Sequence, residues 1–173
     1  MAGSMTRVTA DTNVILGLPE SHAEAQACRE IFALAKEGKI DLAVTRMVDF
    51  DDARGNAMRQ VIRGIRGGYL QEIPEVFRSI YAYPQNPPWV EPDERLEETI
   101  IRCLKPRSVR PWRKLRENDR RDVDHLMAHA RSQRDIFVTC DTGLCKRRDC
   151  LSRLGIRVMK PSEFLRTWHE RST

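Results

Sequence analysis

The sequence has no apolar run that approaches the roughly 20 residues of a membrane-spanning helix. Its five cysteines are an odd number in a chain of 173 residues, so we expect reduced thiols rather than a disulfide framework. The start, MAGSM, lacks the basic-then-apolar pattern of a secretory leader, and we treat residues 1–4 as a cloning remnant ahead of Met5. Together these absences predict a cytoplasmic protein with no membrane segment.

Glycine and proline are not abundant, with nine of each, and the composition is 40% hydrophobic and 32% charged. This composition is typical of a globular chain rather than a fibrous or disordered one, and the length predicts a single domain over residues 5–173. The charge is uneven: residues 101–173 carry a net +10, and residues 1–100 carry −5. A basic half favours a polyanionic partner such as nucleic acid, although a merely arginine-rich surface would look the same.

Apolar periodicity alternates between strand and helix spacing along the chain. Short apolar or β-branched runs predict strands at 6–10, 40–45, 69–73, 135–139 and 156–159. Helical spacing predicts helices at 21–37, 46–64, 93–104, 119–131, 144–154 and 161–168. Strands that alternate with helices indicate parallel βαβ units. We therefore expect a three-layer α/β/α domain with a central parallel sheet of four to five strands, and an inserted helical and loop region around 67–116.

Two of these strands are followed by aspartate, in VTADTN at Asp11 and in VTCDTG at Asp141. Parallel strands end at one edge of a sheet, where ligands collect, so we expect these two carboxylates to lie close together. Gathered carboxylates repel one another, and Mg²⁺ or Mn²⁺ would relieve that repulsion. Taken singly, each aspartate would also serve as a turn or helix-cap residue. Further acids that follow strand 40–45 or begin helix 119–131 are Asp49, Asp51, Asp52, Asp119, Asp122 and Asp124.

With these residues the chain resembles the PIN-domain nucleases, the family that includes the VapC-type ribonuclease toxins. The similar segments are VTADTNVILGL at 8–18, ENDRRDVDHLMAHA at 117–130, DIFVTCDTGL at 135–144 and LGIRVMKPSEFL at 154–165. The resemblance covers both ends of the chain and little of the middle. It implies a PIN-like, Rossmann-like fold and hydrolysis of RNA with Mg²⁺ or Mn²⁺ held by three or four acids.

The resemblance implies catalytic and metal-binding roles for three acids in the matched segments. Asp11 matches the family's first acid, and Asp141 matches its last. Asp122 is the best match to the central acid, with Asp119 and Asp124 as the alternatives in neighbouring register. Asp11, Asp122 and Asp141 are therefore the expected ligands of the cation.

The family's second acid is usually a glutamate after the second strand, and this sequence has only aspartates there. Asp51 is the best match by its distance from Thr45, followed by Asp49, so we expect Asp51 to complete the catalytic set. Asn13 and Thr139 match supporting polar positions near the metal, although a turn and a strand end would explain them as well.

Two basic runs near these acids could hold an RNA backbone. The first surrounds Trp112 in the loop KPRSVRPWRKLR, and the second follows Asp141. Arginines interleaved with an aromatic ring suit phosphates and an unpaired base, whereas a solvated loop with Trp112 on the core is the competing interpretation. The expected RNA-binding residues are Arg110, Arg113, Lys114, Lys146, Arg147 and Arg148.

Histidines and cysteines offer other candidate ligands. His125 and His129 are one helical turn apart, but the HExxH context is absent, so we interpret both as helix-surface or core-edge residues. Cys140, Cys145 and Cys150 lack the short paired spacing of zinc sites, so we expect buried thiols there.

The sequence thus predicts an endoribonuclease that hydrolyses RNA phosphodiester bonds through an acidic cluster with Mg²⁺ or Mn²⁺. It leaves open whether the chain is the toxin of a toxin–antitoxin pair, with an antitoxin protein as partner, and whether it forms a homodimer. The alternative is a non-catalytic nucleic-acid-binding or scaffold domain of the same fold, because the family's usual second glutamate is missing.

Overall fold

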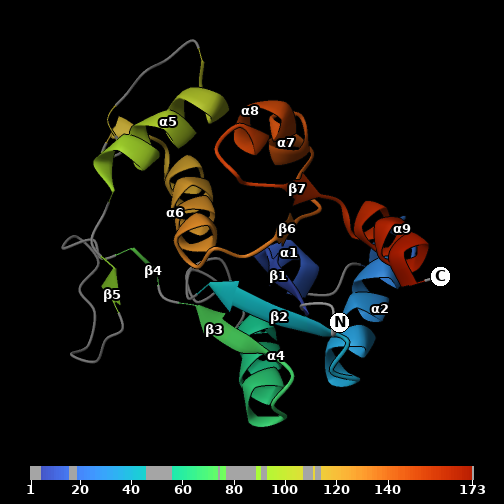
Figure 1. The fold of residues 1–173 in the computed structure, drawn as a ribbon. Helices are drawn as coiled ribbons and strands as arrows, with labels where there is room; N and C mark the ends of the chain where they lie inside the picture. Colours follow the sequence, from blue (N-terminus) through green and yellow to red (C-terminus); the bar gives the residue numbers. More distant parts are fainter. Residues whose placement is uncertain are drawn as a thin grey trace.

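A computed structural model describes residues 5–15, 19–45, 56–73, 75–76, 89–90, 93–106, 111 and 114–172. Five parallel strands form the main sheet, in the order β3-β2-β1-β6-β7, and helices cover both of its faces (Figure 1). The strands are β1 Thr6–Ala10, β2 Ile40–Thr45, β3 Gln71–Ile73, β6 Ile136–Val138 and β7 Val158–Met159. The predicted three-layer α/β/α fold with a parallel sheet is confirmed.

Side chains that alternate along the strands divide the core into two layers. In β1, Val8 and Ala10 belong to one buried cluster, while Thr9 points to the opposite face of the sheet and bonds to a side chain of α6. In β6, Val138 belongs to the first cluster and Phe137 to the second. A parallel sheet that is covered on both faces needs apolar side chains on both, which explains the nearly continuous apolar runs of these strands.

Two layers of helices cover the sheet. The first layer consists of α1 Thr12–Ile15, α2 Ala25–Lys36, α4 Asn56–Arg66 and α9 Pro161–Ser172. The second consists of α5 Glu94–Leu104, α6 Glu117–Arg131, α7 Thr142–Cys145 and α8 Arg148–Ser152. Figure 1 shows α2 beside α9 and α5 beside α6. No helix in the described parts of the chain is long and apolar enough to cross a bilayer.

Some predicted elements differ from the structure. The single helix expected at 144–154 is wrong: α7 and α8 are separated by a tight turn, in which the N–H of Arg147 bonds to the carbonyl of Leu144 at 2.9 Å. The helix expected at 46–64 is described only from Asn56, since 46–55 lie outside the described residues. The region 67–116 contributes β3 to the main sheet and α5 to a helical layer, and it holds a small parallel pair that was not predicted, β4 Glu75–Val76 and β5 Trp89–Val90.

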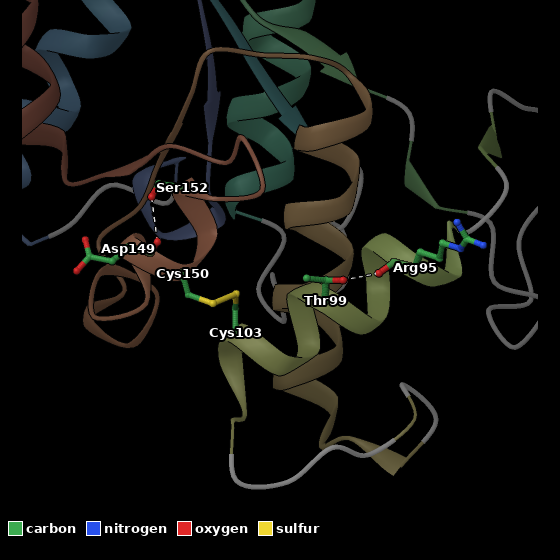
Figure 2. Close-up of a disulfide and its surroundings, with 6 residues drawn as sticks. All are labelled: Arg95, Thr99, Cys103, Asp149, Cys150 and Ser152. Atoms are coloured by element: carbon green, nitrogen blue, oxygen red, sulfur yellow. Dashed lines mark hydrogen bonds between the residues drawn. A yellow bond between two sulfur atoms is a disulfide. The ribbon is translucent and has the colours of Figure 1, made fainter.

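A disulfide joins Cys103 of α5 to Cys150 of α8 across 47 residues of sequence (Figure 2). The two Cα atoms are 5.6 Å apart, an ordinary separation for this bond. The expectation of reduced thiols is therefore wrong for this pair, because the contact between α5 and α8 brings together two cysteines that sequence spacing could not match. The free cysteines among the described residues are Cys28, Cys140 and Cys145.

Candidate functional site

Strand order reverses between β1 and β6, the two neighbours at the centre of the sheet. From β1 the chain winds outward through β2 to β3, and from β6 it continues to β7 on the other side. In doubly wound sheets, ligands bind outside the carboxyl ends of the strands at such a reversal. Asp11 directly follows β1 and Asp141 lies three residues after β6, so the topology brings both acids to this point.

An open cavity of about 320 Å³, here named the acid pocket, lies at this reversal. Helix α1, which begins directly after Asp11, and the first turns of α6 contribute to its wall. Asp11, Asp122 and Asp141, the three predicted metal ligands, share the pocket although they come from distant parts of the chain. Its lining residues are Asp11, Thr12, Asn13, Asn118, Arg121, Asp122, His125 and Asp141.

Asp11 is 8% exposed, and hydrogen bonds hold both of its carboxylate oxygens. Its Oδ1 accepts from the N–H of Thr12 at 2.8 Å, and its Oδ2 accepts from the Thr139 hydroxyl at 2.5 Å and from the Asn13 amide at 2.9 Å. The side-chain oxygen of Asn13 in turn accepts from the N–H of Cys140 at 2.9 Å. Asn13 and Thr139, which the sequence singled out as supporting residues, therefore fix the Asp11 carboxylate across the junction of β1 and β6.

Asp141 caps helix α7 and also lines the acid pocket. Its Oδ1 accepts from the N–H groups of Gly143 at 2.5 Å and Leu144 at 3.1 Å, and its own N–H donates to the Thr139 hydroxyl at 2.9 Å. A Cβ atom on Gly143 would lie 2.9 Å from the same Oδ1, so a glycine there lets the carboxylate approach the helix closely. The interpretation of Asp141 as a helix cap is therefore correct, and it is compatible with a place in the pocket.

Asp122 experiences the negative field of the other acids. Burial raises the pKa of its carboxyl from the ordinary 3.8 to about 7, and the charge of Asp11 adds to the rise. His125 acts in the opposite direction, whereas Asp141 and Asp119 raise the pKa further. Positive charge favours the ionised form of a carboxyl, so a cation in the pocket would bring the pKa of Asp122 down again.

His125 and Arg121 line the acid pocket, and the sequence had not indicated either as a site residue. His125 is 2% exposed, and its Nδ1 is hydrogen-bonded to the hydroxyl of Thr45, the last residue of β2. Of the two predicted positions, the helix surface is wrong for His125, because α6 packs over the carboxyl end of β2, and the core edge agrees with its place in the lining of the pocket. The position of His125 three residues after Asp122 places both on one helix face, and that spacing could have identified it.

His129, one turn further along α6, is fully buried against β1, so the prediction of a helix-surface or core-edge position is wrong for this residue. Its Nδ1 lies 2.8 Å from the hydroxyl of Thr9, and its ring meets the ring of Phe137 edge-on. Burial lowers the pKa of His129 to about 4, and the charge of Arg134 lowers it further in the same direction. His129 is therefore a neutral core residue at pH 7.

Asp119 and Asp124, the two other candidate acids of α6, are not among the described residues that line the acid pocket. Asp119 forms an ion pair with Lys105 at 2.8 Å, and Asp124 is 1% exposed within the fold. Of the three candidate aspartates in α6, Asp122 alone is among the described lining residues. The aspartates outside the described residues are Asp49, Asp51 and Asp52, so the expected second acid has no described position.

The predicted RNA-binding residues have different environments. Lys146 and Arg147 are exposed directly after α7. Arg148 was expected to bind RNA, but its Nη1 donates to both carboxylate oxygens of Glu163 in α9, at 3.0 and 3.2 Å. Of the first basic run, Lys114 is exposed, whereas Arg110, Trp112 and Arg113 lie outside the described part of the chain.

The donor types of the acid pocket suit a hard divalent cation. Mg²⁺ prefers carboxylate oxygens and is usually held by one or two carboxylates together with several waters. Within the described ranges, no group of three or more His, Cys, Asp or Glu side chains could hold a metal ion. Asp11, Asp122 and Asp141 therefore fit a cation bound by one or two carboxylates and water better than a cation enclosed by protein ligands.

Comparison with known proteins assigns no family: no protein-family model matches the chain, and no curated protein matches it. The resemblance to the PIN-domain nucleases depends on the sequence segments quoted above. What the chain does must therefore be inferred from the acid pocket and the residues around it.

Proposed function

We propose that this protein is a Mg²⁺- or Mn²⁺-dependent endoribonuclease, a hydrolase of RNA phosphodiester bonds. The observation that carries the proposal is the convergence of Asp11, Asp122 and Asp141 on one open pocket at the reversal of strand order. Burial and the charge of Asp11 raise the pKa of Asp122 there to about 7. Carboxylates that repel one another in an open pocket do not favour folding, and such perturbed groups are typical of functional sites.

The residues of the acid pocket have roles that are consistent with hydrolysis. One or two of Asp11, Asp122 and Asp141 would hold the cation directly and the rest through water; when bound, the cation would polarise a phosphate oxygen and lower the pKa of a water. Asn13 and Thr139 hold the Asp11 carboxylate in a fixed orientation through their hydrogen bonds to Oδ2. The ligand geometry then does not have to be reorganised when substrate arrives.

Binding of an RNA backbone is the second part of the proposal. Residues 101–173 carry a net charge of +10, and Lys146 and Arg147 are exposed at the end of the helix that Asp141 caps. Contacts of this kind hold phosphates and position the strand without reading its bases. Asp51 remains the proposed fourth acid.

The test is cleavage of a labelled single-stranded RNA by the full chain in Mg²⁺, in Mn²⁺ and in EDTA. We expect cleavage with either cation and none with EDTA. Asp11→Asn and Asp122→Asn should each lower the rate about 100-fold or more, because each removes a ligand charge at nearly constant shape. Asp119→Asn is the matched control, since it makes the same change on the same helix at an acid that pairs with Lys105, and it should change the rate less than about threefold.

Equal rates in wild type and Asp11→Asn, or full activity in EDTA, would contradict this function. RNA binding without cleavage in either cation would favour the alternative, a non-catalytic nucleic-acid-binding or scaffold domain. A gel-shift measurement on the same samples separates loss of binding from loss of hydrolysis.

A further inference from the structure

Residues of α2 and α4 line a second cavity. Both helices belong to the layer that covers the first face of the sheet (Figure 1). The cavity measures about 420 Å³ and is lined by Arg29, Phe32, Lys36, Arg63 and Tyr69; we name it the basic–aromatic pocket. Lys36 ends α2 four residues before β2 begins, and Tyr69 lies two residues before β3. The pocket is therefore close to the amino ends of these strands, whereas the acid pocket lies at the carboxyl ends of β1 and β6.

The α2 side of the pocket presents two cations and one ring. Arg29, Phe32 and Lys36 follow one another at spacings of three and four residues, which places them on one helix face. The guanidinium of Arg29 is oriented by Gln26, whose side-chain oxygen accepts from Nε at 3.2 Å and from Nη2 at 2.7 Å. Phe32 is partly buried against the core, so its ring has a fixed support.

Glycines fix the ring of Tyr69 on the other side of the pocket. A Cβ atom on Gly67 would lie 2.8 Å from Cε1 of Tyr69, and one on Gly64 would lie 3.2 Å from Cε2, so these glycines let the ring rest against the end of α4. Gly68 has a φ of 73°, a conformation that favours glycine, and it turns the chain from α4 toward Tyr69. The Nζ of Lys36 lies 5.2 Å from the centre of this ring, a cation–π distance.

The described lining of the basic–aromatic pocket carries unbalanced positive charge. The described residues that line it include Arg29, Lys36 and Arg63 but no acid. The acids of α2 and its C-terminal cap form ion pairs elsewhere: Glu30 with His169 at 2.8 Å, and Glu37 with Lys39 at 2.7 Å. The pocket thus combines three cations and two rings within the half of the sequence that carries a net charge of −5.

We propose that the basic–aromatic pocket binds a nucleotide, with its phosphate on Arg29, Lys36 and Arg63 and its base on Tyr69 and Phe32. Guanidinium and ammonium groups form charge-assisted hydrogen bonds to phosphate oxygens, and bases stack on flat side chains. The cavity volume lies within the range of small-ligand sites, roughly 300–1,000 Å³. The nucleotide is either free or one unit of an RNA strand, because both present the same phosphate and ring. The site is separate from the acid pocket and does not depend on the proposed ribonuclease activity.

Calorimetric titration of the full chain with adenosine 5′-monophosphate, inorganic phosphate and adenosine tests the proposal, with EDTA present to keep cations out of the acid pocket. We expect the nucleotide to bind about tenfold more tightly than phosphate or adenosine alone. Its affinity should fall as salt is added. Tyr69→Leu should weaken binding about 5- to 100-fold through loss of stacking, and Arg63→Gln about tenfold. Tyr69→Phe keeps the ring and removes only the hydroxyl, so it should bind the nucleotide as wild type does. This variant shows whether the ring itself is what the nucleotide requires.

Lys39→Gln is the matched control, because Lys39 is exposed near the same end of α2 but pairs with Glu37 and does not line the pocket. Its nucleotide affinity should equal that of wild type. A 2′-O-methyl RNA pentamer distinguishes the two sources: competition at higher affinity indicates a strand, and nucleotide binding without competition indicates a free ligand. No nucleotide binding at millimolar concentration, equal losses in Lys39→Gln and Arg63→Gln, or equally tight binding of an acidic peptide would overturn the proposal. These outcomes are independent of cleavage at the acid pocket.

Discussion

The acid pocket and the basic–aromatic pocket differ in charge, in position and in construction. Residues that follow β1 and β6, together with α6, build the first, and there burial and the charge of Asp11 raise the pKa of Asp122 to about 7. Faces of α2 and α4 and the turn before β3 build the second, and its cations are exposed. The difference shows where charge has a cost in this fold: half-buried Asp122 should couple stability to pH and to cations, whereas exposed Arg29 and Lys36 should respond to ligand and salt.

The disulfide should have the largest effect on stability, and it joins α5 to α8 within the second helical layer. Cys103–Cys150 spans 47 residues, for which the chain-entropy relation gives about 4 kcal/mol. We expect the double change Cys103→Ser and Cys150→Ser to lower the free energy of unfolding in urea by about 2–4 kcal/mol. Nucleotide affinity of the folded protein should stay the same, because the bond ties α5 to α8 and neither helix lines the basic–aromatic pocket. A loss under about 0.5 kcal/mol would show that packing alone holds α5 and α8 together.

Asp122→Asn should stabilise the metal-free protein in a pH-dependent way. The folded pKa of about 7 exceeds the ordinary 3.8, so wild type loses stability as pH rises from about 4 to 7, where the unfolded chain is ionised and the folded chain is not. Relative to wild type, we expect no gain at pH 3.5 and a gain of roughly 2–4 kcal/mol at pH 8. The comparison cancels the opposite trend of buried His129, which destabilises the fold as pH falls from about 6.5 to 4. Urea unfolding at both pH values measures this, and an equal gain at both would contradict it.

Thr139→Val should affect both stability and cleavage. Thr139 is fully buried, and its hydroxyl donates to Asp11 while it accepts from the N–H of Asp141. Valine has nearly the same shape but leaves these groups with fewer partners, so we expect a loss of about 1–3 kcal/mol and roughly tenfold slower cleavage. Thr142→Val is the control, because Thr142 is exposed on α7, and it should change stability by less than about 0.5 kcal/mol. Similar losses in the two variants would show that the buried hydroxyl has no special role.

The strands and strand-end acids could be predicted from the sequence because their signals are local. The predicted bounds of β1 and β2 agree with the structure to the residue, since each is a short apolar run that a turn or a polar residue ends. Asp11 and Asp141 share an edge because parallel strands do. Local patterns could not choose among Asp119, Asp122 and Asp124, because all three lie within two turns of α6 and only the packing of that helix decides which one lines the pocket.

Features that depend on which helices are neighbours could not be predicted. The Cys103–Cys150 bond requires that α5 lie beside α8, and the basic–aromatic pocket requires that α2 lie beside α4. Arg63 and Lys36 belong to different helices, with β2 between them in the sequence, so no spacing rule connects them. Arg148 looked like its exposed neighbour Arg147 in sequence, and only the approach of Glu163 from α9 distinguishes the two.

Replacing Lys146 and Arg147 should have the smallest effect, because it should weaken only the binding of RNA near the acid pocket. Lys146→Gln with Arg147→Gln should weaken RNA binding a few-fold and lower the log–log salt slope by about 1.4, or about 0.7 for each phosphate that is no longer neutralised. Nucleotide binding to the basic–aromatic pocket should not change. Arg148→Gln should instead lower stability by about 0.5–1 kcal/mol, because it breaks the partly exposed pair with Glu163. Filter binding across a salt series measures the slopes, and an unchanged slope would exclude Lys146 and Arg147 from the RNA interface.

The most direct test of the acid pocket as a cation site is the pKa of the Asp122 carboxyl, measured by carbon-detected NMR without and with Mg²⁺. Without the cation we predict a pKa of about 7, and with saturating Mg²⁺ we predict a clearly lower pKa, because a bound cation favours the carboxylate. A pKa of Asp122 that stays the same with saturating Mg²⁺ or Mn²⁺, or one near 4 without them, would contradict the account.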